Sequence, residues 1–183
     1  MHAHKGNGTV VSMAVLVVTL GALLSFARDG HAQTRVFVQV PNIAGEAIDA
    51  GFRQQIDAVS FSTGANASLD GTTKPTLEPF VITKSLDSAS IPLAFAALQG
   101  TIFPSITVTV ATPARGGLRV VSTFKLRNAL VTNVHMTTAS GDGAPVEQVI
   151  VAFTQLEATY VAVDPMTGAS RPVTSTWDTL RNK

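Results

Sequence analysis

The chain has 183 residues, of which 13 are Lys or Arg, 12 are Asp or Glu and none is Cys. The formal net charge of +1 and the lack of a basic cluster argue against a nucleic-acid partner. The lack of cysteine excludes a disulfide framework and an anchor in which a cysteine carries lipid.

The first 32 residues have the pattern of a secretory signal peptide. Lys5 gives a weakly positive start, residues 10–27 carry no charge, and Gly30-His31-Ala32 places small residues where a signal peptidase reads. We predict cleavage after Ala32 and a secreted or periplasmic protein that no longer contacts the membrane. The competing interpretation is an uncleaved anchor, but the uncharged run is at the lower limit for a spanning helix, which needs about 20 residues.

The remaining residues, 33–183, carry equal numbers of basic and acidic side chains, and their length suits one domain with a hydrophobic core. Residues 35–40 alternate between polar and apolar side chains and end at Pro41, as expected of a strand. Residues 52–63 are predicted to form a second strand. The polar segment 63–79, which contains Gly and Pro, is predicted to be a long exposed loop.

The segment Phe80–Val110 is predicted to form a strand, a short helix and a second strand with strict alternation. Ser88 or Ser90 can cap the helix start, because a serine hydroxyl can accept a hydrogen bond from a free backbone N–H. Pro92 falls in the first turn, where its missing N–H is tolerated. Gly100 lies where a helix end favours a left-handed residue.

Three apolar residues of the predicted helix, Ile91, Phe95 and Leu98, are spaced four and three apart. They therefore share one face of the helix, and we expect this face to pack on the core. On this interpretation, Phe95→Asp detaches the helix and abolishes the folded state.

The rest of the chain has the pattern of several further strands separated by turns. The predicted strands are residues 105–112, 118–126, 129–137, 146–163 (one bent strand) and 171–177. Residues 113–117 are predicted to be a hairpin turn, and Asp164–Gly168 another turn. Many strands with one helix indicate a mainly β fold, either a compact barrel or a sandwich.

The candidate core residues are apolar members of the alternating segments. They are Val36, Val38, Ile56, Phe61, Ile106, Val108, Val149, Val151 and Phe153.

The candidate catalytic residues are unconvincing. His135 is the only histidine after residue 32, and it is expected to face solvent or a backbone carbonyl rather than to act as a base. Glu147 and Glu157 lie ten residues apart without the polar company of a glycosidase pair, so surface or interface ion pairing is expected of them. We predict no catalytic, cofactor-binding or metal-binding residue, and a protein that is not an enzyme.

Short motifs elsewhere favour turns over ligand sites. Asp70-Gly71 and Asp142-Gly143 are turn formers without an EF-hand pattern, and Arg115-Gly116-Gly117 lacks the ending of a phosphate-binding loop. Asn66-Ala67-Ser68 fits a glycosylation sequon, a triplet that also occurs by chance. Trp177 could stack on a sugar, but core packing or a subunit contact is expected instead.

Several motifs, in order, resemble the Hcp family of the type VI secretion system. They are Phe37–Val40 with Ile43-Ala44-Gly45-Glu46, residues 56–64, Phe80–Asp87 with its Thr-Lys-x-x-Asp ending, Ser90–Gly100, Glu147 with Phe153 and Tyr160, and Trp177-Asp178 with Asn182. Each motif alone is weak, but their order and spacing together are fairly specific over residues 35–182.

The resemblance implies a small antiparallel β-barrel of two packed sheets with one short flanking α-helix. It further implies a structural, secreted protein that forms homo-hexameric rings, and these rings stack into a tube that carries effectors. Its partners would be further copies of itself, effector proteins and the secretion apparatus, with no cofactor.

The leader departs from the family pattern, because ordinary members assemble in the cytoplasm without a signal peptide. Either the protein is an exported relative with another role, or the true start of translation lies further downstream. The alternative function is an exported, monomeric periplasmic module that keeps the barrel and binds a peptide or envelope component through residues 63–79.

Overall fold

The structure is a computed structural model that describes residues 33–67, 74–137, 145–164 and 166–181. The chain divides into two units, Met1–Gly30 and His31–Lys183, and all described residues belong to the second. The predicted signal peptide and the turn motifs at residues 70–71 and 142–143 lie outside the described residues.

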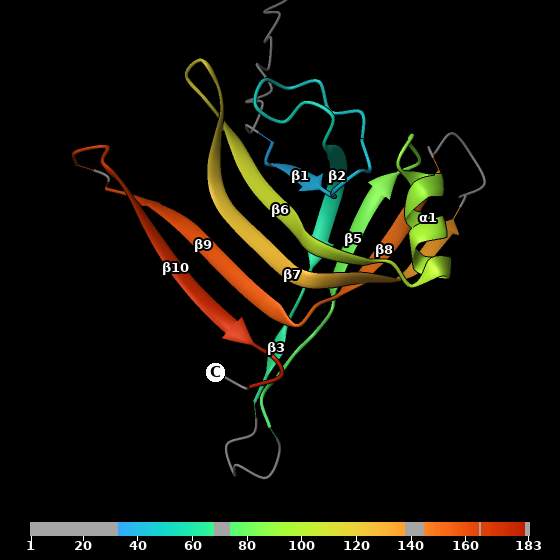
Figure 1. The fold of residues 1–183 in the computed structure, drawn as a ribbon. Coiled ribbons are helices and arrows are strands. Elements are labelled where there is room, and N and C mark those ends of the chain that lie inside the picture. The colour runs from blue at the N-terminus through green and yellow to red at the C-terminus, as the bar shows by residue number, and fades with distance from the viewer. Residues whose placement is uncertain (1–32, 68–73, 138–144, 165, 182–183) are drawn as a thin grey trace, which may run out of the picture. The chain divides into compact units, whose positions relative to one another are not determined.

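The described residues form ten strands and one helix, which Figure 1 shows as a ribbon. They are β1 (Arg35–Gln39), β2 (Ile56–Ser62), β3 (Ala65–Asn66), β4 (Thr76–Leu77), β5 (Phe80–Ser85), α1 (Ser90–Gln99), β6 (Ile102–Ala114), β7 (Gly117–Thr137), β8 (Val146–Ala152), β9 (Gln155–Val163) and β10 (Ser170–Asp178).

Six antiparallel strands close into a barrel. Their order is β7-β6-β1-β2-β5-β8, and an additional pairing of β8 with β7 completes the circle (Figure 1). The inner face of the closed sheet surrounds one hydrophobic core, and β9 and β10 lie outside the barrel. The mainly β class and the barrel with one short helix are confirmed.

The long strand β7 belongs to both the barrel and the extra strands. Its residues 130–137 pair with β8, whereas residues 122–127 pair with β9 along the same edge. The prediction of one bent strand over 146–163 is wrong in detail, because the strand is interrupted at residues 153–154. Beyond this break β9 pairs with β10, and we call β9 and β10 together the wing.

The barrel interior is filled by alternate residues of its strands, as the period of two in a strand requires. Val36 and Val38 of β1 pair with Val110 and Val108 of β6, and Val36, Val38 and Val108 join one core cluster. Seven of the nine predicted core residues are buried there, and Phe61 and Phe153 are partly buried against it.

A second, smaller cluster lies on the outside of β1. Phe37 stacks on Phe52 with ring centroids 4.2 Å apart, and Ala111 of β6 is buried beside them. Phe52 was predicted to begin a strand, but β2 begins only at Ile56. The difference arises because the chain turns at Gln54, whose positive φ of 62° interrupts an extended strand.

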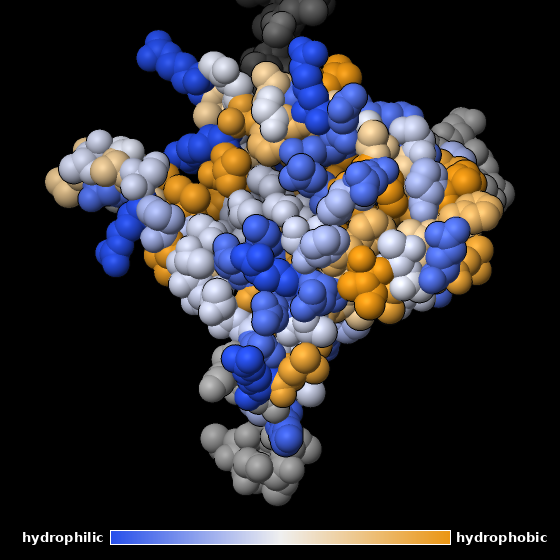
Figure 2. All heavy atoms as spheres, viewed as in Figure 1, coloured by the Kyte–Doolittle hydropathy of each residue, from blue (hydrophilic) through white to orange (hydrophobic). Residues whose placement is uncertain are grey.

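Helix α1 turns the opposite face to the barrel from the one predicted. Leu93 and Ala96 are buried in the barrel core, whereas Ile91, Phe95 and Leu98 are 61, 56 and 82 % exposed. The buried-face assignment is therefore wrong, and the expectation that Phe95→Asp unfolds the protein loses its basis. In Figure 2, hydrophobic spheres gather over α1 at the right of the view.

The start of α1 also differs from the prediction, because no side chain makes a cap hydrogen bond there. Ser90 Oγ instead accepts from the N–H of Asp87 at 3.0 Å, and Asp87 Oδ1 accepts from the N–H of Ala89 at 2.9 Å. The predicted end is confirmed, since Gly100 has a left-handed φ of 63°.

Two predicted turns take the expected form. Arg115-Gly116 joins β6 to β7 as a two-residue hairpin turn, with Gly116 at a φ of 91°. Asp164 accepts hydrogen bonds from the N–H groups of Met166 and Thr167 in the turn before β10. The described residues of the segment 63–79, which are 63–67 and 74–79, are largely exposed, but they also contain the short paired strands β3 and β4.

Candidate functional site

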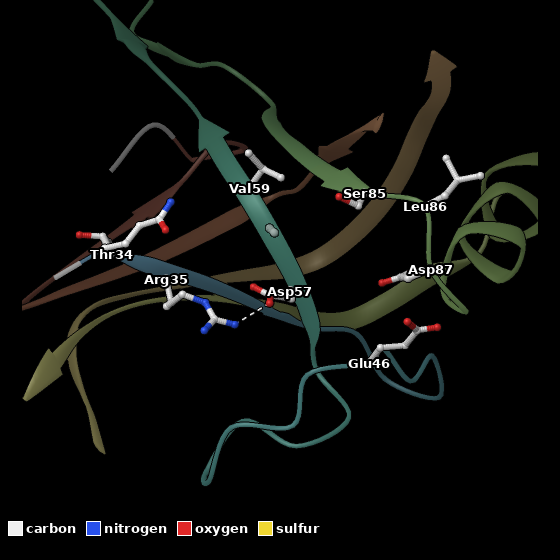
Figure 3. A pocket seen from close by; sticks show the side chains of 10 residues that line it. Thr34, Arg35, Glu46, Asp57, Val59, Ser85, Leu86 and Asp87 are labelled. Carbon is white, nitrogen blue, oxygen red and sulfur yellow. Dashed lines mark hydrogen bonds and ion pairs between the residues drawn. The ribbon is translucent and has the colours of Figure 1, made fainter. Parts of the chain in front are cut away.

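A groove of about 440 Å³ runs over the outer side of β2 (Figure 3). Arg35 donates hydrogen bonds across it to Asp57 at 2.6 Å and to Asp49 at 3.1 Å. The hydrogen bond to Asp57 raises the pKa of Arg35. Arg35 is the cation among the lining residues, and it is already paired, so the groove shows no signature of a phosphate or carboxylate ligand.

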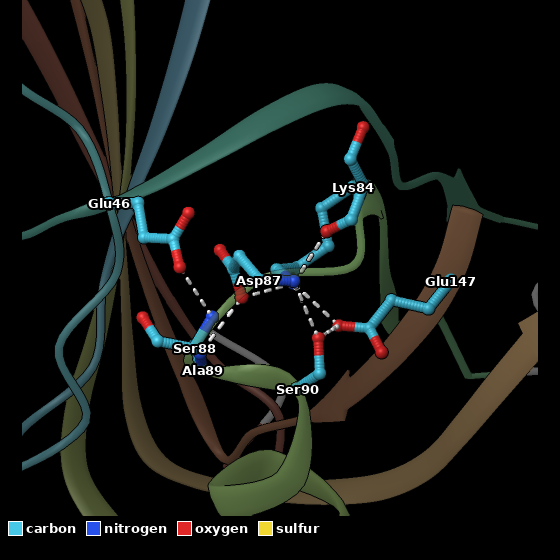
Figure 4. Close-up of polar contacts among 8 residues, drawn as sticks. Glu46, Lys84, Asp87, Ser88, Ala89, Ser90 and Glu147 are labelled. Atoms are coloured by element: carbon cyan, nitrogen blue, oxygen red, sulfur yellow. Dashed lines mark hydrogen bonds and ion pairs between the residues drawn. The ribbon is translucent and has the colours of Figure 1, made fainter. Parts of the chain in front are cut away.

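A buried ion pair lies at the end of the barrel beside this groove (Figure 4). Lys84 and Glu147 are directly opposite each other on β5 and β8, and both point into the barrel. Lys84 Nζ lies 2.6 Å from Glu147 Oε1, and both side chains are essentially inaccessible to solvent. The aliphatic stem of Lys84 continues the row that Phe80 and Ile82 begin on the same strand.

Asp87, which precedes α1, and Ser90, the first residue of α1, complete this cluster. Lys84 Nζ lies 2.6 Å from Asp87 Oδ1, and it donates to Ser90 Oγ at 3.1 Å. Ser90 Oγ in turn donates to Glu147 Oε1 at 3.0 Å. We call these four residues the buried ion cluster. It joins β5, β8 and α1 through charge-assisted hydrogen bonds, which are stronger than neutral ones.

A turn that precedes β2 packs against the same place. Gly45 lies so close to the backbone of Gln55 and Ile56 that a Cβ at position 45 would collide with it. This close approach brings the next residue, Glu46, within reach of α1, and its Oε1 accepts from the N–H of Ser88 at 2.9 Å (Figure 4).

The chemistry of the buried ion cluster is structural. The Lys84 ammonium is fully occupied by two carboxylates, a hydroxyl and the Ser85 carbonyl oxygen at 2.8 Å, so it is not available to a substrate. Glu147 Oε2 is buried without a hydrogen-bond partner. No group of residues within the described ranges could hold a metal ion.

The residues singled out in the sequence do not come together. Glu147 is buried against Lys84, so the prediction of a surface or interface ion pair is wrong for this residue. It escaped sequence reasoning because its partner is 63 residues away, and only the strand register brings the two together. Glu157 forms the expected surface pair with Arg127 at 3.0 Å. His135 is exposed on β7, opposite Gln148.

The first uncovered apolar surface is the outer stripe of α1, which consists of Ile91, Phe95 and Leu98. The helix sequence, SIPLAFAALQ, has no charged residue on any side. A helix that is apolar all round is normally buried, whereas a surface helix has a polar face. The outer stripe therefore has the composition of a contact surface.

The second uncovered apolar surface lies on the wing. Leu126 and Leu156 are paired on β7 and β9, and both contact the barrel core. Because side chains alternate, Tyr160 lies on the same face as Leu156, and its partner Val173 and the partner of Leu156, Trp177, lie there too. We call this the inner face of the wing. Tyr160 is 56 % and Val173 51 % exposed.

Trp177 lies on the inner face of the wing, not on its polar face, and its side chain is not fully buried. It is partly buried and lines an apolar cleft beside the β3–β4 hairpin. Among the described residues, no helix is both long and apolar enough to span a membrane.

Comparison with protein families identifies the family of this chain. Residues 37–160 match the family described as "Type VI secretion system effector, Hcp". The chain belongs to the Hcp family. It is thus a bacterial secreted protein of the type VI secretion system, and its role is structural rather than enzymatic. No curated protein sequence matches the chain.

Solved structures show that the Hcp fold covers most of the chain. A type VI secretion system protein is 23 % identical, with a TM-score of 0.73 over 82 % of this chain and 99 % of that one. Hcp1 from Salmonella typhimurium is 19 % identical, with a TM-score of 0.68 over 82 % and 97 %. A type VI secretion system effector from Yersinia pestis is 20 % identical, with a TM-score of 0.63 over 78 % and 98 %.

Parts of four motifs that pointed to the Hcp family are far apart in sequence but adjacent in space. The Ile-x-Gly-Glu turn, the Thr-Lys-x-x-Asp strand end, the helix start and Glu147 all meet at the buried ion cluster or beside it (Figure 4). These motifs therefore hold α1 against the barrel rather than form a catalytic centre.

Proposed function

We propose that this Hcp-family protein is exported and assembles into homo-hexameric rings, which stack into a tube that carries effector proteins. The observation that carries the proposal is the outer stripe of α1. Three large apolar side chains, each more than half exposed, lie side by side on a helix without any charge. A lone exposed apolar residue needs no explanation, but a contiguous patch of this kind marks a contact surface.

A closed ring of identical subunits is the form of assembly that family membership supports. In a ring each subunit offers two different surfaces, one to each neighbour, and closure leaves no apolar surface open at an end. The Hcp-family subunit has two such surfaces, the outer stripe and the inner face of the wing.

The N-terminal sequence supports export through a cleavable leader, with the cut after Ala32. This part of the proposal is tested separately, by the N-terminal sequence of the protein recovered from the periplasm or the medium. A protein that begins at Gln33 agrees with cleavage. A protein that retains residues 10–27 contradicts it, and a later start of translation would be seen as an N-terminus at Met13, the one Met between Met1 and Met136.

A second candidate function is a monomeric periplasmic binding module that has kept the barrel. The apolar cleft lined by Leu77 and Trp177, beside the exposed hairpin of β3 and β4, is the observation that favours it. This module would bind an apolar side chain of a peptide there, and it would not form rings.

The deciding experiment is the mass in solution of residues 33–183, measured by light scattering after size exclusion. A mass six times that of the subunit agrees with the ring, and electron microscopy of the same sample then shows whether rings stack into tubes. A monomer that persists at all concentrations contradicts the ring and leaves the binding module as the function.

A further inference from the structure

The two uncovered apolar surfaces of the subunit lie on opposite sides of the barrel. In Figure 1, α1 is at the right of the barrel and the wing is at the left. The outer stripe of one subunit therefore cannot reach the inner face of its own wing. If these surfaces cover each other, they must do so between two copies.

The two surfaces match in charge. On α1 every residue is uncharged. On the wing, the alternation of the strands places Glu157 and Asp178, together with their neighbour Arg127, on the face opposite Tyr160 and Val173. The one charged residue on the inner face is Arg171, at the beginning of β10. Apolar surfaces without charge can be desolvated together without burying an unpaired ion.

The two surfaces also match in form. A helix presents a ridge of side chains, whereas a sheet presents a broad face of alternate residues. In the barrel of the same subunit, the opposite side of α1 already packs on a sheet: α1 contacts β7, and Leu93 and Ala96 join the core cluster that also contains Ala129 and Val131. On the wing, the same strand β7 continues next to β9, but no helix within the described ranges covers Tyr160 and Val173.

We infer that the outer stripe of α1 in one copy of the chain packs on the inner face of the wing in the next copy. The contact is heterologous, because it joins two different surfaces, and repetition with a closing rotation produces a ring. This inference rests on the proposed ring and names the two surfaces that meet in it. Every subunit in the ring then has α1 covered on both sides by β-sheet, one its own and one its neighbour's.

The chain has no cysteine, so introduced thiols test the contact directly. Four double variants combine Phe95→Cys or Leu98→Cys with Tyr160→Cys or Val173→Cys. On oxidation, at least one of them is expected to give a ladder of covalent oligomers on a denaturing gel. The four single variants are expected to stay monomeric on the gel, because a residue does not meet its own copy in a heterologous contact.

The matched control combines Leu98→Cys with Ile48→Cys. Ile48 is as exposed as Leu98, at 85 %, but it lies on the loop between β1 and β2, outside both surfaces. This variant is expected to give no ladder. A second pair tests the assembly without thiols: Phe95→Asp is expected to convert the ring to folded monomers, whereas Ile48→Asp leaves the mass unchanged.

The outcomes separate this inference from the proposed ring. Light scattering of the unmodified protein is done first. If it forms a ring but none of the four double variants gives a ladder, and Phe95→Asp keeps the ring, the pairing of α1 with the wing is wrong although the ring stands. A covalent dimer from a single variant, which has one thiol per chain, contradicts the heterologous contact. An unmodified protein that remains monomeric contradicts both the ring and this pairing.

Discussion

The two halves of β7 lie in very different surroundings. In the barrel half, where residues 130–137 pair with β8, Val131 is fully buried and the strand is paired along this one edge beyond Leu130. In the half that reaches the wing, residues 122–127 are paired on both edges, with β6 and β9, but the apolar face that this half shares with Tyr160 and Val173 is largely open. One continuous strand therefore contributes both to a complete core and to an incomplete one.

The difference teaches that hydrogen-bond pairing and core formation are separate requirements. In the wing, the backbone N–H and C=O groups of β9 and β10 form hydrogen bonds with each other, so the wing is a regular sheet. It lacks a layer to cover its apolar face, and stable domains are built from two packed layers. The barrel half is covered within the subunit, whereas in the wing half Tyr160 and Val173 stay more than half exposed.

The largest effect is expected from the buried ion cluster, which closes the barrel half. Lys84→Met leaves Glu147 as an uncompensated buried charge, and we expect the free energy of unfolding to fall by about 3–5 kcal/mol. Urea unfolding at one fixed protein concentration measures this. The double variant Lys84→Met, Glu147→Leu should recover much of the loss, because it removes both charges.

Lys125→Met is the matched control on the wing half of β7, where Lys125 pairs with Glu157 in register on the polar face. Its effect is expected to stay within about 0.5 kcal/mol. Equal losses in Lys84→Met and Lys125→Met would mean that the buried ion cluster does not hold the barrel closed.

A somewhat smaller effect distinguishes the two faces of α1. Leu93→Ala leaves a cavity in the barrel core and should lower the free energy of unfolding by about 2–5 kcal/mol. Leu98→Ala, on the outer stripe, should leave the unfolding of the isolated subunit almost unchanged but shift the ring towards monomers. Calorimetry and light scattering of both variants measure the two effects. A large loss of subunit stability in Leu98→Ala would contradict the assignment of Leu98 to the outer stripe and would indicate that it packs in the core.

The polar side of the wing should contribute little. The pair of Arg127 and Glu157 is about 40 % exposed on both sides, at 43 % and 37 %, so solvent and salt screen it. Arg127→Ala is expected to cost about 0.2–1 kcal/mol, and Arg119→Ala, at an exposed position near the hairpin turn, still less. The difference between the two should shrink when unfolding is repeated in high salt, and a difference that grows would contradict a surface pair.

The smallest effect concerns the turn at the tip of the wing. Hydrogen bonds from the N–H groups of Thr167 and then Met166 lower the pKa of Asp164 below its usual value. A lowered carboxyl pKa stabilises the folded state above the pKa of the unfolded chain, and this stabilisation is lost as the pH falls through the folded-state pKa. An NMR titration should find a lower pKa in the folded protein than in a peptide of residues 162–170. Equal values would show that the turn does not hold the carboxylate.

The sequence predicted the barrel strands well because each buries one face. Val36 and Val38, and Ile106 and Val108, alternate with polar or outward-facing residues, and this pattern is sufficient to place them in the core. It was less successful at residues 146–163. A change of partner from β5 to β10 at the break changes the surroundings of the strand but not its apolar composition.

Which face of α1 packs on the barrel could not be predicted, because the helix has an apolar residue on nearly every side. Periodicity correctly grouped Ile91, Phe95 and Leu98 on one face, but Leu93 and Ala96 form a second face of similar composition. A pattern of one chain cannot tell which face packs on its own core and which on a neighbour. For the same reason, the contact of Lys84 with Glu147 required the register of β5 on β8.

The length of β7 has a mechanical consequence for an assembled subunit. With 21 residues at about 3.4 Å each, the strand extends over roughly 70 Å along its path, from the wing to the surface under α1. A pull between a neighbour that holds α1 and another that holds the wing would run along this one covalent strand. Its ladders with β6, β8 and β9 would then be loaded lengthwise, so that many hydrogen bonds resist at the same moment instead of opening one after another.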